Sequence, residues 1–244
     1  MANAQFEQMA GSSIHLSGVS RIYSHGTSTD AGAVGISDVD CDVAAGDYVA
    51  VVGPSGSGKT TLLNIIAALD KADSGQVVVA GTDLGRASRS ELARFRLNEV
   101  GIVFQDSLLV PELSVFANVA MPGVLRKDAR RALEKRVLEL LERLGLENLA
   151  DRLPHELSGG QRQRVAVARS VVNSPGLVVA DEPTGSLDSA HGSQVIELLE
   201  EINLAGATLV MVTHDPSVAA RARSQLHVVD GLVSSVLADA IDVP

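Results

Sequence analysis

Gly53-Pro54-Ser55-Gly56-Ser57-Gly58-Lys59-Thr60 is a complete G-x-x-x-x-G-K-T sequence, and it is the strongest structural signal in this 244-residue chain. An apolar run at residues 48–52 precedes it, and residues 62–69 carry an apolar stripe at helical spacing. Glycines in such a loop let backbone N–H groups turn toward phosphate oxygens, and the following helix presents its positive N-terminal end. The segment therefore predicts a nucleoside triphosphate site in an α/β fold.

Four side chains of this segment have expected roles in binding the nucleotide. Lys59 is expected to reach the β- and γ-phosphates, and the Thr60 hydroxyl is expected to bind Mg²⁺. Ser57 and Thr61 are expected to make secondary contacts. A nucleoside triphosphate and Mg²⁺ are therefore the expected ligands of this loop, and the segment at residues 157–161 narrows the nucleotide to ATP.

Further polar side chains follow other apolar runs that are predicted to be buried strands. Ligands of open α/β sheets bind at the carboxyl ends of the strands. There, Asp181 is expected to hold Mg²⁺ through water, and Glu182 to orient and deprotonate the attacking water. Gln105 is expected to contact both Mg²⁺ and that water, and His214 to sense the γ-phosphate. These residues are the candidate catalytic group, together with Lys59.

A second anion site is predicted in Leu157-Ser158-Gly159-Gly160-Gln161. Ser158, Gly159 and Gly160 open a predicted helix over residues 160–172, and a serine with two glycines at a helix start forms an anion-binding terminus. The phosphate loop already serves the chain's own nucleotide. This second site is therefore expected to face the ATP of a partner.

Composition limits the classes of function. The formal net charge is −10, and nucleic-acid binders usually carry a basic domain or stripe, so no nucleic-acid partner is expected. The single Cys41 is expected to be a buried thiol, with no disulfide or metal cluster. Residues 1–13 lack a signal-peptide pattern, and no apolar run approaches the roughly 20 residues that span a bilayer. A cytosolic chain with no direct membrane span is expected.

One domain over residues 1–244 is predicted, because alternating strand and helix patterns favour a buried parallel sheet. Residues 106–157 have helical patterns with interruptions at Pro122-Gly123 and Pro154, and they are interpreted as a helical insertion. The ATP-binding core is then formed by 1–105 and 158–244. The tail after Val236 is expected to be a loose terminus. A basic run inside the insertion is interpreted as a solvated helix face, with anionic lipid or an acidic permease loop as the alternative partner; its members are Arg126, Lys127, Arg130, Arg131, Lys135 and Arg136.

The motifs together resemble the nucleotide-binding domain of ABC transporters, in order and over nearly the whole chain. The residues that carry the resemblance are 53–60, Gln105, 157–161, Asp181-Glu182, Ser186-Leu187-Asp188 and His214. The resemblance implies a P-loop NTPase (RecA-like) core with an antiparallel β subdomain and an inserted α-helical subdomain. It also implies a head-to-tail homodimer with two ATP molecules between each phosphate loop and the opposing Leu-Ser-Gly-Gly-Gln segment.

Two further site residues come from the resemblance. It implies that Asp188, in the turn 185–188, lies among the nucleotide-binding residues and couples the two sites. It also implies that Tyr23 stacks on adenine, whereas the residues alone indicate only a tyrosine at a strand end.

Finer features resemble the ATPases of macrolide exporters and lipoprotein-release complexes, with cell-division, haem-efflux and peptide-efflux ATPases as neighbours. These features are Leu69-Asp70-Lys71, 100–105, Ala117-Asn118-Val119 and 180–185. The chain departs from the family pattern at residues 24–36. Residues 111–128 are short where the family receives a permease helix, which leaves the identity of the permease open.

The resemblance implies an ATP-hydrolysing subunit that drives an integral-membrane permease of the macrolide-exporter type in export or extrusion. Such a subunit is cytoplasmic and lies on the inner face of the cell membrane through the permease. The alternative is the ATPase of a mechanical signalling complex, which regulates an extracytoplasmic enzyme without transport. A nucleic-acid or ribosome ATPase is disfavoured by the single cassette and the acidic charge.

Overall fold

A computed structural model describes residues 6, 8–23 and 33–237 of the chain. The strands are β1 (Ile14–Tyr23), β2 (Ala33–Val43), β3 (Tyr48–Val52), β4 (Ser74–Val79), β5 (Thr82–Asp83), β6 (Val100–Val103), β7 (Leu177–Asp181), β8 (Thr208–Val212), β9 (Ser224–Val229) and β10 (Leu232–Leu237). The helices are α1 (Lys59–Ile66), α2 (Arg89–Glu99), α3 (Val115–Arg126), α4 (Arg130–Arg143), α5 (Gly159–Val171), α6 (Ser189–Leu204) and α7 (Pro216–Ala219). Two 3-10 turns cover Glu147–Leu149 and Pro154–Glu156.

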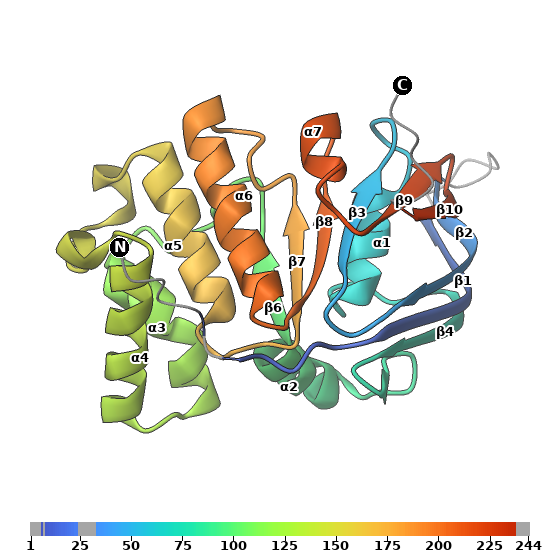
Figure 1. The fold of residues 1–244 in the computed structure, drawn as a ribbon. Helices are drawn as coiled ribbons and strands as arrows, with labels where there is room; N and C mark the ends of the chain where they lie inside the picture. The colour runs from blue at the N-terminus through green and yellow to red at the C-terminus, as the bar shows by residue number, and fades with distance from the viewer. Residues whose placement is uncertain (1–5, 7, 24–32, 238–244) are drawn as a thin grey trace.

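These strands form two sheets (Figure 1). The smaller sheet is antiparallel, with the strand order β2-β1-β4-β5. The larger sheet has the order β10-β9-β3-β8-β7-β6, and only its β10–β9 pair is antiparallel among the described strands. The α/β class with an antiparallel β part is therefore confirmed.

Both faces of the larger sheet are buried, because its central strands send alternate side chains into two cores. Val178 of β7 and Leu209 of β8 lie in the core shared with α3 to α6. Their neighbours Val179 and Val210 lie in the core shared with α1, α2 and the smaller sheet. A parallel sheet covered on both faces gives the continuous apolar strands seen in the sequence.

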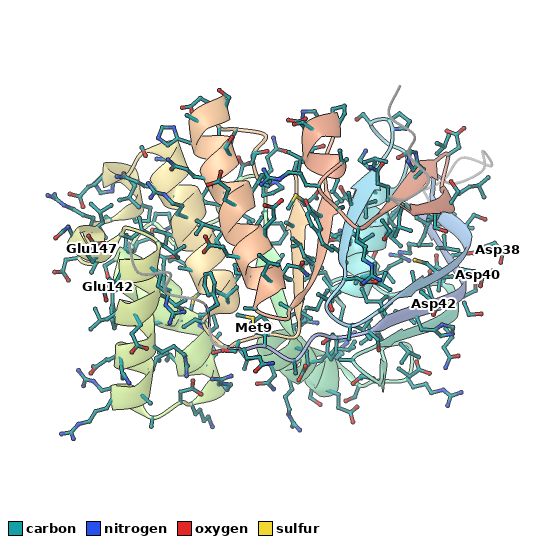
Figure 2. All side chains as sticks on the ribbon, in the orientation of Figure 1. Met9, Asp38, Asp40, Asp42, Glu142 and Glu147 are labelled. Carbon is teal, nitrogen blue, oxygen red and sulfur yellow. The ribbon has the colours of Figure 1, made fainter. Side chains whose placement is uncertain are left out.

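In the strand β2, exposed and buried side chains alternate, because one face of this strand is in water. Asp38, Asp40 and Asp42 lie on its exposed side (Figure 2), while Val39 and Val43 are buried. Cys41 is partly rather than fully buried, which corrects the expected buried thiol. Burial still raises the pKa of this thiol to about 11, so it is an unreactive group at neutral pH.

Residues 106–157 form α3, α4 and the two 3-10 turns, and the structure shows no strand in this segment. The expected interruption at Pro122-Gly123 is wrong, because α3 continues through both residues to Arg126. A Cβ on Gly123 would lie 2.3 Å from Leu133 Cδ1, so the glycine lets α3 pack closely on α4. The helix ends instead at Lys127, which has a φ of 64°.

Acidic neighbours pair with four of the six residues in the basic run. Arg126 and Arg136 both bind Asp128, while Arg130 binds Glu134 and Lys135 binds Glu139. The exposed pairs of Arg130 and Lys135 fit the interpretation of a solvated helix face, whereas Arg126 and Arg136 form a partly buried cluster with Asp128.

Three smaller expectations have different outcomes. The apolar stripe after the phosphate loop is shorter than predicted, because α1 ends at Ile66 and Leu69 is 44% exposed. The tail after Val236 falls largely on residues 238–244, outside the described residues. No helix of the described chain is long and apolar enough to cross a membrane.

Candidate functional site

The strand register brings the predicted site residues to one edge of the larger sheet. Val51 of β3 pairs with Val212 of β8, and Val212 pairs in turn with Asp181 of β7. Val103 of β6 pairs with Ala180 of β7. Since these strands are parallel, the segments that follow them leave the sheet at the same edge.

The phosphate loop needs glycine at both of its ends. Gly53 has a φ of 151°, and a Cβ there would lie 2.0 Å from the carbonyl oxygen of Val228. Gly58 has a φ of 109°, and a Cβ there would lie 1.9 Å from the carbonyl oxygen of Gly35. Any side chain at either position would collide with backbone. Gly56, by contrast, has open space around it, which leaves the middle of the loop accessible.

Two polar side chains of the loop are arranged to receive phosphate. The Lys59 ammonium is largely buried and donates to the carbonyl oxygens of Gly53, at 2.9 Å, and Pro54, at 2.8 Å. The Ser57 hydroxyl is buried and has no hydrogen-bond partner among the described residues. A buried hydroxyl without a partner is costly, so both groups fit an anion that enters the loop.

Thr60 and Asp181 provide adjacent hard oxygen ligands. The Thr60 hydroxyl donates to Asp181 Oδ2 at 3.1 Å. Burial raises the pKa of Asp181 above its usual value, although the hydrogen bond from Thr60 opposes the shift. No group of three or more His, Cys, Asp or Glu side chains in the described chain could hold a metal by itself. A hydroxyl and a carboxylate oxygen side by side fit Mg²⁺, which takes few protein ligands and completes its shell with phosphate and water.

Glu182, which directly follows Asp181 at the end of β7, lies beside His214. Its Oε2 is 3.3 Å from His214 Nδ1, and its backbone N–H donates to the carbonyl oxygen of Val212 at 3.0 Å. Glu182 has a φ of 45°, a left-handed conformation that is unfavourable for a side-chain-bearing residue. Strained residues of this kind gather at functional sites.

Gln105 lies against the turn that follows β7. A Cβ on Gly185 would lie 2.9 Å from Gln105 Nε2, and the Ser186 hydroxyl donates to the Gln105 carbonyl oxygen at 3.3 Å. This contact links the end of β6 to the segment that carries Asp188.

Asp188 and Ser158 cap the helices α6 and α5. Asp188 accepts from the His191 N–H at 3.0 Å, and its other oxygen contacts His191 Nδ1 at 2.7 Å. Ser158 accepts from the Gln161 N–H at 3.2 Å, and the Ser158 N–H donates to Gln161 Oε1 at 2.8 Å. A Cβ on Gly160 would lie 2.8 Å from His191 Cδ2. The start of α5 therefore packs at Gly160 against the His191 ring at the start of α6.

The structure does not bring the Ser158 segment to the chain's own phosphate loop. In Figure 1, α6, β7 and β8 separate α5, which begins after Ser158, from α1, which begins at Lys59. All the other predicted residues apart from Tyr23 lie in segments at the carboxyl edge of the larger sheet. Thr61 is buried on α1 in the turn after Thr60.

Tyr23 ends β1 in the smaller sheet, and Gly35 of β2 lies between it and α1: a Cβ on Gly35 would lie 2.8 Å from both Tyr23 Cε2 and Thr61 Cγ2. The Tyr23 hydroxyl donates to Asp70 Oδ2 at 3.0 Å, and Arg21 lies over the tyrosine ring. In the sequence, Asp70 is only part of a segment that resembles one family branch, and Arg21 is not among the predicted site residues. Arg21 Nε also donates to Asp70 Oδ2, and no short-range sequence signal marks this contact, since Arg21 and Asp70 are 49 positions apart.

Comparisons with known proteins identify the family of this chain. A family model described as ABC transporter matches residues 36–185. The macrolide export ATP-binding/permease protein MacB of Rhodopseudomonas palustris is 41% identical over 236 residues, which cover 97% of this chain and 35% of that protein. The lipoprotein-releasing system ATP-binding protein LolD of Shewanella oneidensis is 47% identical over 197 residues, which cover 80% of this chain and 86% of that protein. The chain thus spans about a third of the length of the MacB relative.

A solved structure is also similar over nearly the whole fold. It is the dimeric, post-hydrolysis state of an ATP-binding cassette bound to ADP and Pi. The TM-score is 0.85 and the sequence identity is 35%, with 93% of this chain and 100% of that chain covered.

Proposed function

The chain belongs to the ABC transporter family and is an ATPase of that family, and from this premise we propose that two copies work as a dimeric motor. Each copy contributes a phosphate loop to one ATP and the Ser158–Gly160 segment to the other. One observation carries this proposal: α6, β7 and β8 separate the start of α5 from the phosphate loop of the same chain.

The helix start at Ser158 supports a role in binding the partner's nucleotide. Ser158 is exposed, and α5 begins at Gly159. The capping box between Ser158 and Gln161 uses the N–H groups of these two residues, so Gly159 and Gly160 supply the N–H groups that the first turn would offer to an anion. Backbone N–H groups at such a turn bind anions, and the helix dipole favours negative charge there. The γ-phosphate of the partner's ATP is a ligand of this chemistry. The similar solved cassette, which is dimeric and holds ADP and Pi, is consistent with the same arrangement.

In the proposed reaction each residue acts through its position. Lys59 leaves its two carbonyl partners and neutralises the β- and γ-phosphates. Mg²⁺, when bound, supplies further charge neutralisation to the phosphates. Thr60 and Asp181 hold the metal, with Gln105 as a further contact to it. Glu182 accepts the proton of the attacking water, and His214 holds both the carboxylate of Glu182 and the γ-phosphate.

The nucleotide is further positioned by the rest of the predicted set. The loop residues 53–58 supply backbone N–H groups, with Ser57 and Thr61 close to the phosphates. Tyr23 stacks on adenine. Asp188 holds the start of α6 next to Gly160, and through this contact a change at one ATP site reaches the other.

The partner is proposed to be an integral-membrane permease of the macrolide-exporter type, and the work done is export or extrusion. The two relatives support this proposal, because one is named for macrolide export and the other for lipoprotein release. The ATPase dimer would then lie on the inner face of the cell membrane through the permease. Residues 106–157 would form a helical subdomain between the two parts of the ATP-binding core, 1–105 and 158–244.

A dilution experiment tests the shared site. At saturating Mg-ATP, the specific ATPase activity of the chain is expected to fall as the protein is diluted below its dimerisation range, because each site needs two subunits. Tethering two copies through a flexible linker is expected to restore the activity, since the linker raises the effective concentration. Specific activity that stays constant upon dilution would contradict the proposal.

A further inference from the structure

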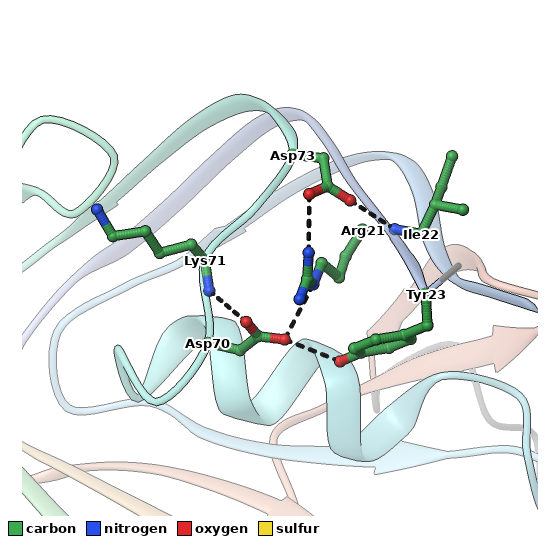
Figure 3. Close-up of polar contacts among 6 residues, drawn as sticks. All are labelled: Arg21, Ile22, Tyr23, Asp70, Lys71 and Asp73. Carbon is green, nitrogen blue, oxygen red and sulfur yellow. Dashed lines mark hydrogen bonds and ion pairs between the residues drawn. The ribbon is translucent and has the colours of Figure 1, made fainter. Parts of the chain in front are cut away.

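The hydroxyl and one face of the Tyr23 ring are already occupied by neighbouring side chains (Figure 3). The hydroxyl donates to Asp70 Oδ2 at 3.0 Å. The guanidinium carbon of Arg21 lies 4.7 Å from the ring centroid, which is the distance of a cation–π contact. A third contact limits the ring edge, because a Cβ on Gly35 would lie 2.8 Å from Tyr23 Cε2.

Arg21 is itself held by two carboxylates. Its Nε donates to Asp70 Oδ2 at 2.9 Å, and its Nη1 donates to Asp73 Oδ1 at 2.8 Å. These hydrogen bonds raise the pKa of Arg21 above its usual value. Burial opposes ionisation of Asp70, but the bonds from the Lys71 N–H, Tyr23 and Arg21 together lower the pKa of this carboxyl below its usual value. The bonds from the Ile22 N–H and from Arg21 likewise lower the pKa of Asp73. Arg21, Asp70 and Asp73 therefore stay charged at neutral pH.

The same carboxylates tie the end of β1 to the segment that follows α1. Asp73 Oδ2 accepts from the Ile22 N–H at 2.8 Å, and the Asp73 N–H donates to the Ser20 carbonyl oxygen at 2.8 Å. Asp70 Oδ1 accepts from the Lys71 N–H at 2.8 Å. The segment with Asp70 and Asp73 follows α1, and α1 begins at Lys59 of the phosphate loop. These bonds therefore connect the tyrosine to the phosphate loop through α1.

We propose that Arg21 and Asp70 are positioning residues that fix the Tyr23 ring for the adenine of ATP. The proposal rests on the stacking role of Tyr23 proposed above. Arg21 lies over one face of the ring, so the base is proposed to stack on the other face, while the bond from the hydroxyl to Asp70 fixes the ring orientation. A ring that is ordered before the nucleotide arrives loses less conformational entropy upon binding.

Binding of two phosphate ligands tests this role. Mg-ATP carries the base, whereas Mg-tripolyphosphate contacts only the phosphate loop. Arg21→Gln and Tyr23→Phe are each expected to weaken Mg-ATP binding about threefold, since a cation–π contact or a hydrogen bond of this size is lost. Neither variant is expected to change the affinity for Mg-tripolyphosphate. Arg86→Gln removes another Arg–Asp ion pair, with Asp83, and serves as the control that changes neither affinity.

Coupling to Tyr23 gives the second measurement. In a Tyr23→Ala background, Arg21→Gln is expected to cause no further loss of Mg-ATP affinity, because there is no ring left to position. The positioning role would be overturned if Arg21→Gln lowered the Mg-ATP affinity equally in the wild-type and Tyr23→Ala proteins. It would also be overturned if Arg21→Gln lowered the affinity for Mg-tripolyphosphate as much as that for Mg-ATP. If Tyr23→Ala weakens Mg-ATP binding and Arg21→Gln does not, the positioning role alone fails. If Tyr23→Ala binds Mg-ATP as the wild type does, the stacking role of Tyr23 fails as well.

Discussion

His214 Nδ1 lies 3.3 Å from Glu182 Oε2, across the ends of the neighbouring strands β8 and β7. The His214 side chain is 70% exposed, whereas the Glu182 side chain is 27% exposed. The imidazole therefore reaches out over the edge of the sheet while the carboxylate stays recessed. In this arrangement the histidine can hold both Glu182 and an incoming phosphate, with a water molecule between them.

Replacement of His214 is expected to affect turnover more than binding. His214→Ala removes the contact that orients Glu182, and kcat is expected to fall about 100-fold, the lower end of general acid–base contributions. The KM for ATP is expected to change little, because the phosphate loop stays intact. Steady-state kinetics checks this, with His15→Ala as the control, since His15 lies on the exposed side of β1. A His214→Ala enzyme with wild-type kcat would exclude this role.

Gly160 and Gly159 provide a matched pair at the start of α5. Gly160→Ala places a Cβ 2.8 Å from His191 Cδ2, whereas a Cβ at Gly159 would make ordinary contacts with Leu187 Cδ2 at 3.5 Å and Arg162 Nη2 at 4.0 Å. Gly160→Ala is expected to lower the free energy of unfolding by about 1 to 2 kcal/mol, because overpacking outweighs the helix preference for alanine. Gly159→Ala is expected to be neutral or slightly stabilising.

The same steric cause predicts a rescue. Adding His191→Ala to Gly160→Ala removes the ring and is expected to recover most of the loss, beyond the sum of the single effects. Urea unfolding of the four variants measures this coupling. Strictly additive free energies would show that the imidazole is not the obstacle.

Asp128 is expected to stabilise the α3–α4 hairpin in a pH-dependent way. Two arginines, Arg126 and Arg136, lower the pKa of Asp128 to about 2 through their hydrogen bonds. A carboxyl with a lowered pKa in the folded state stabilises above its unfolded pKa, and this contribution is lost as the pH falls toward the folded pKa. The side chain is 14% exposed, so solvent screens the interaction little.

Asp128→Asn is therefore expected to lower the free energy of unfolding at pH 7 by about 1 to 2 kcal/mol. The difference from wild type is expected to shrink as the pH falls from about 4 toward about 2. Urea titrations over this range measure it, and Asp151→Asn, at an exposed site, is the control. A difference that is the same at both ends of the range would show that the ion pairs do not cause it.

Local patterns predicted the strand β3 to the residue, because this strand is a continuous apolar run that leads directly into the phosphate loop. The path through Pro122 was not predicted. A proline lacks an N–H and usually ends a helix, but here the close packing of Gly123 on Leu133 keeps the helix intact. Such long-range packing leaves no signal in the residues next to the proline.

In the candidate site too, local motifs predicted some features, while contacts between distant residues were not predicted. The phosphate loop, Asp181-Glu182 and His214 were located from motifs, because each follows a strand that ends at one sheet edge. The Arg21–Asp70 contact was not located, because the two residues meet only when the smaller sheet packs beside α1. The positive φ of Glu182 was also not predicted, since glycine is the residue expected in that conformation.

The central claim is that Ser158 of one subunit faces the ATP of the other, and an ATP-dependent dimer tests it most directly. Glu182→Gln keeps the shape of the side chain but cannot accept the proton, so it is expected to bind ATP without turnover. This variant is then expected to accumulate as a dimer in the presence of Mg-ATP. Size-exclusion chromatography with light scattering measures the mass.

Adding Ser158→Arg places a bulky cation where the partner's phosphate and Lys59 must approach. The double variant is expected to bind Mg-ATP with the affinity of one phosphate loop and to stay monomeric. Glu182→Gln with Ser90→Arg, at an exposed position of α2, is expected to dimerise as before. A Glu182→Gln/Ser158→Arg protein that still forms the ATP-dependent dimer would contradict the shared site.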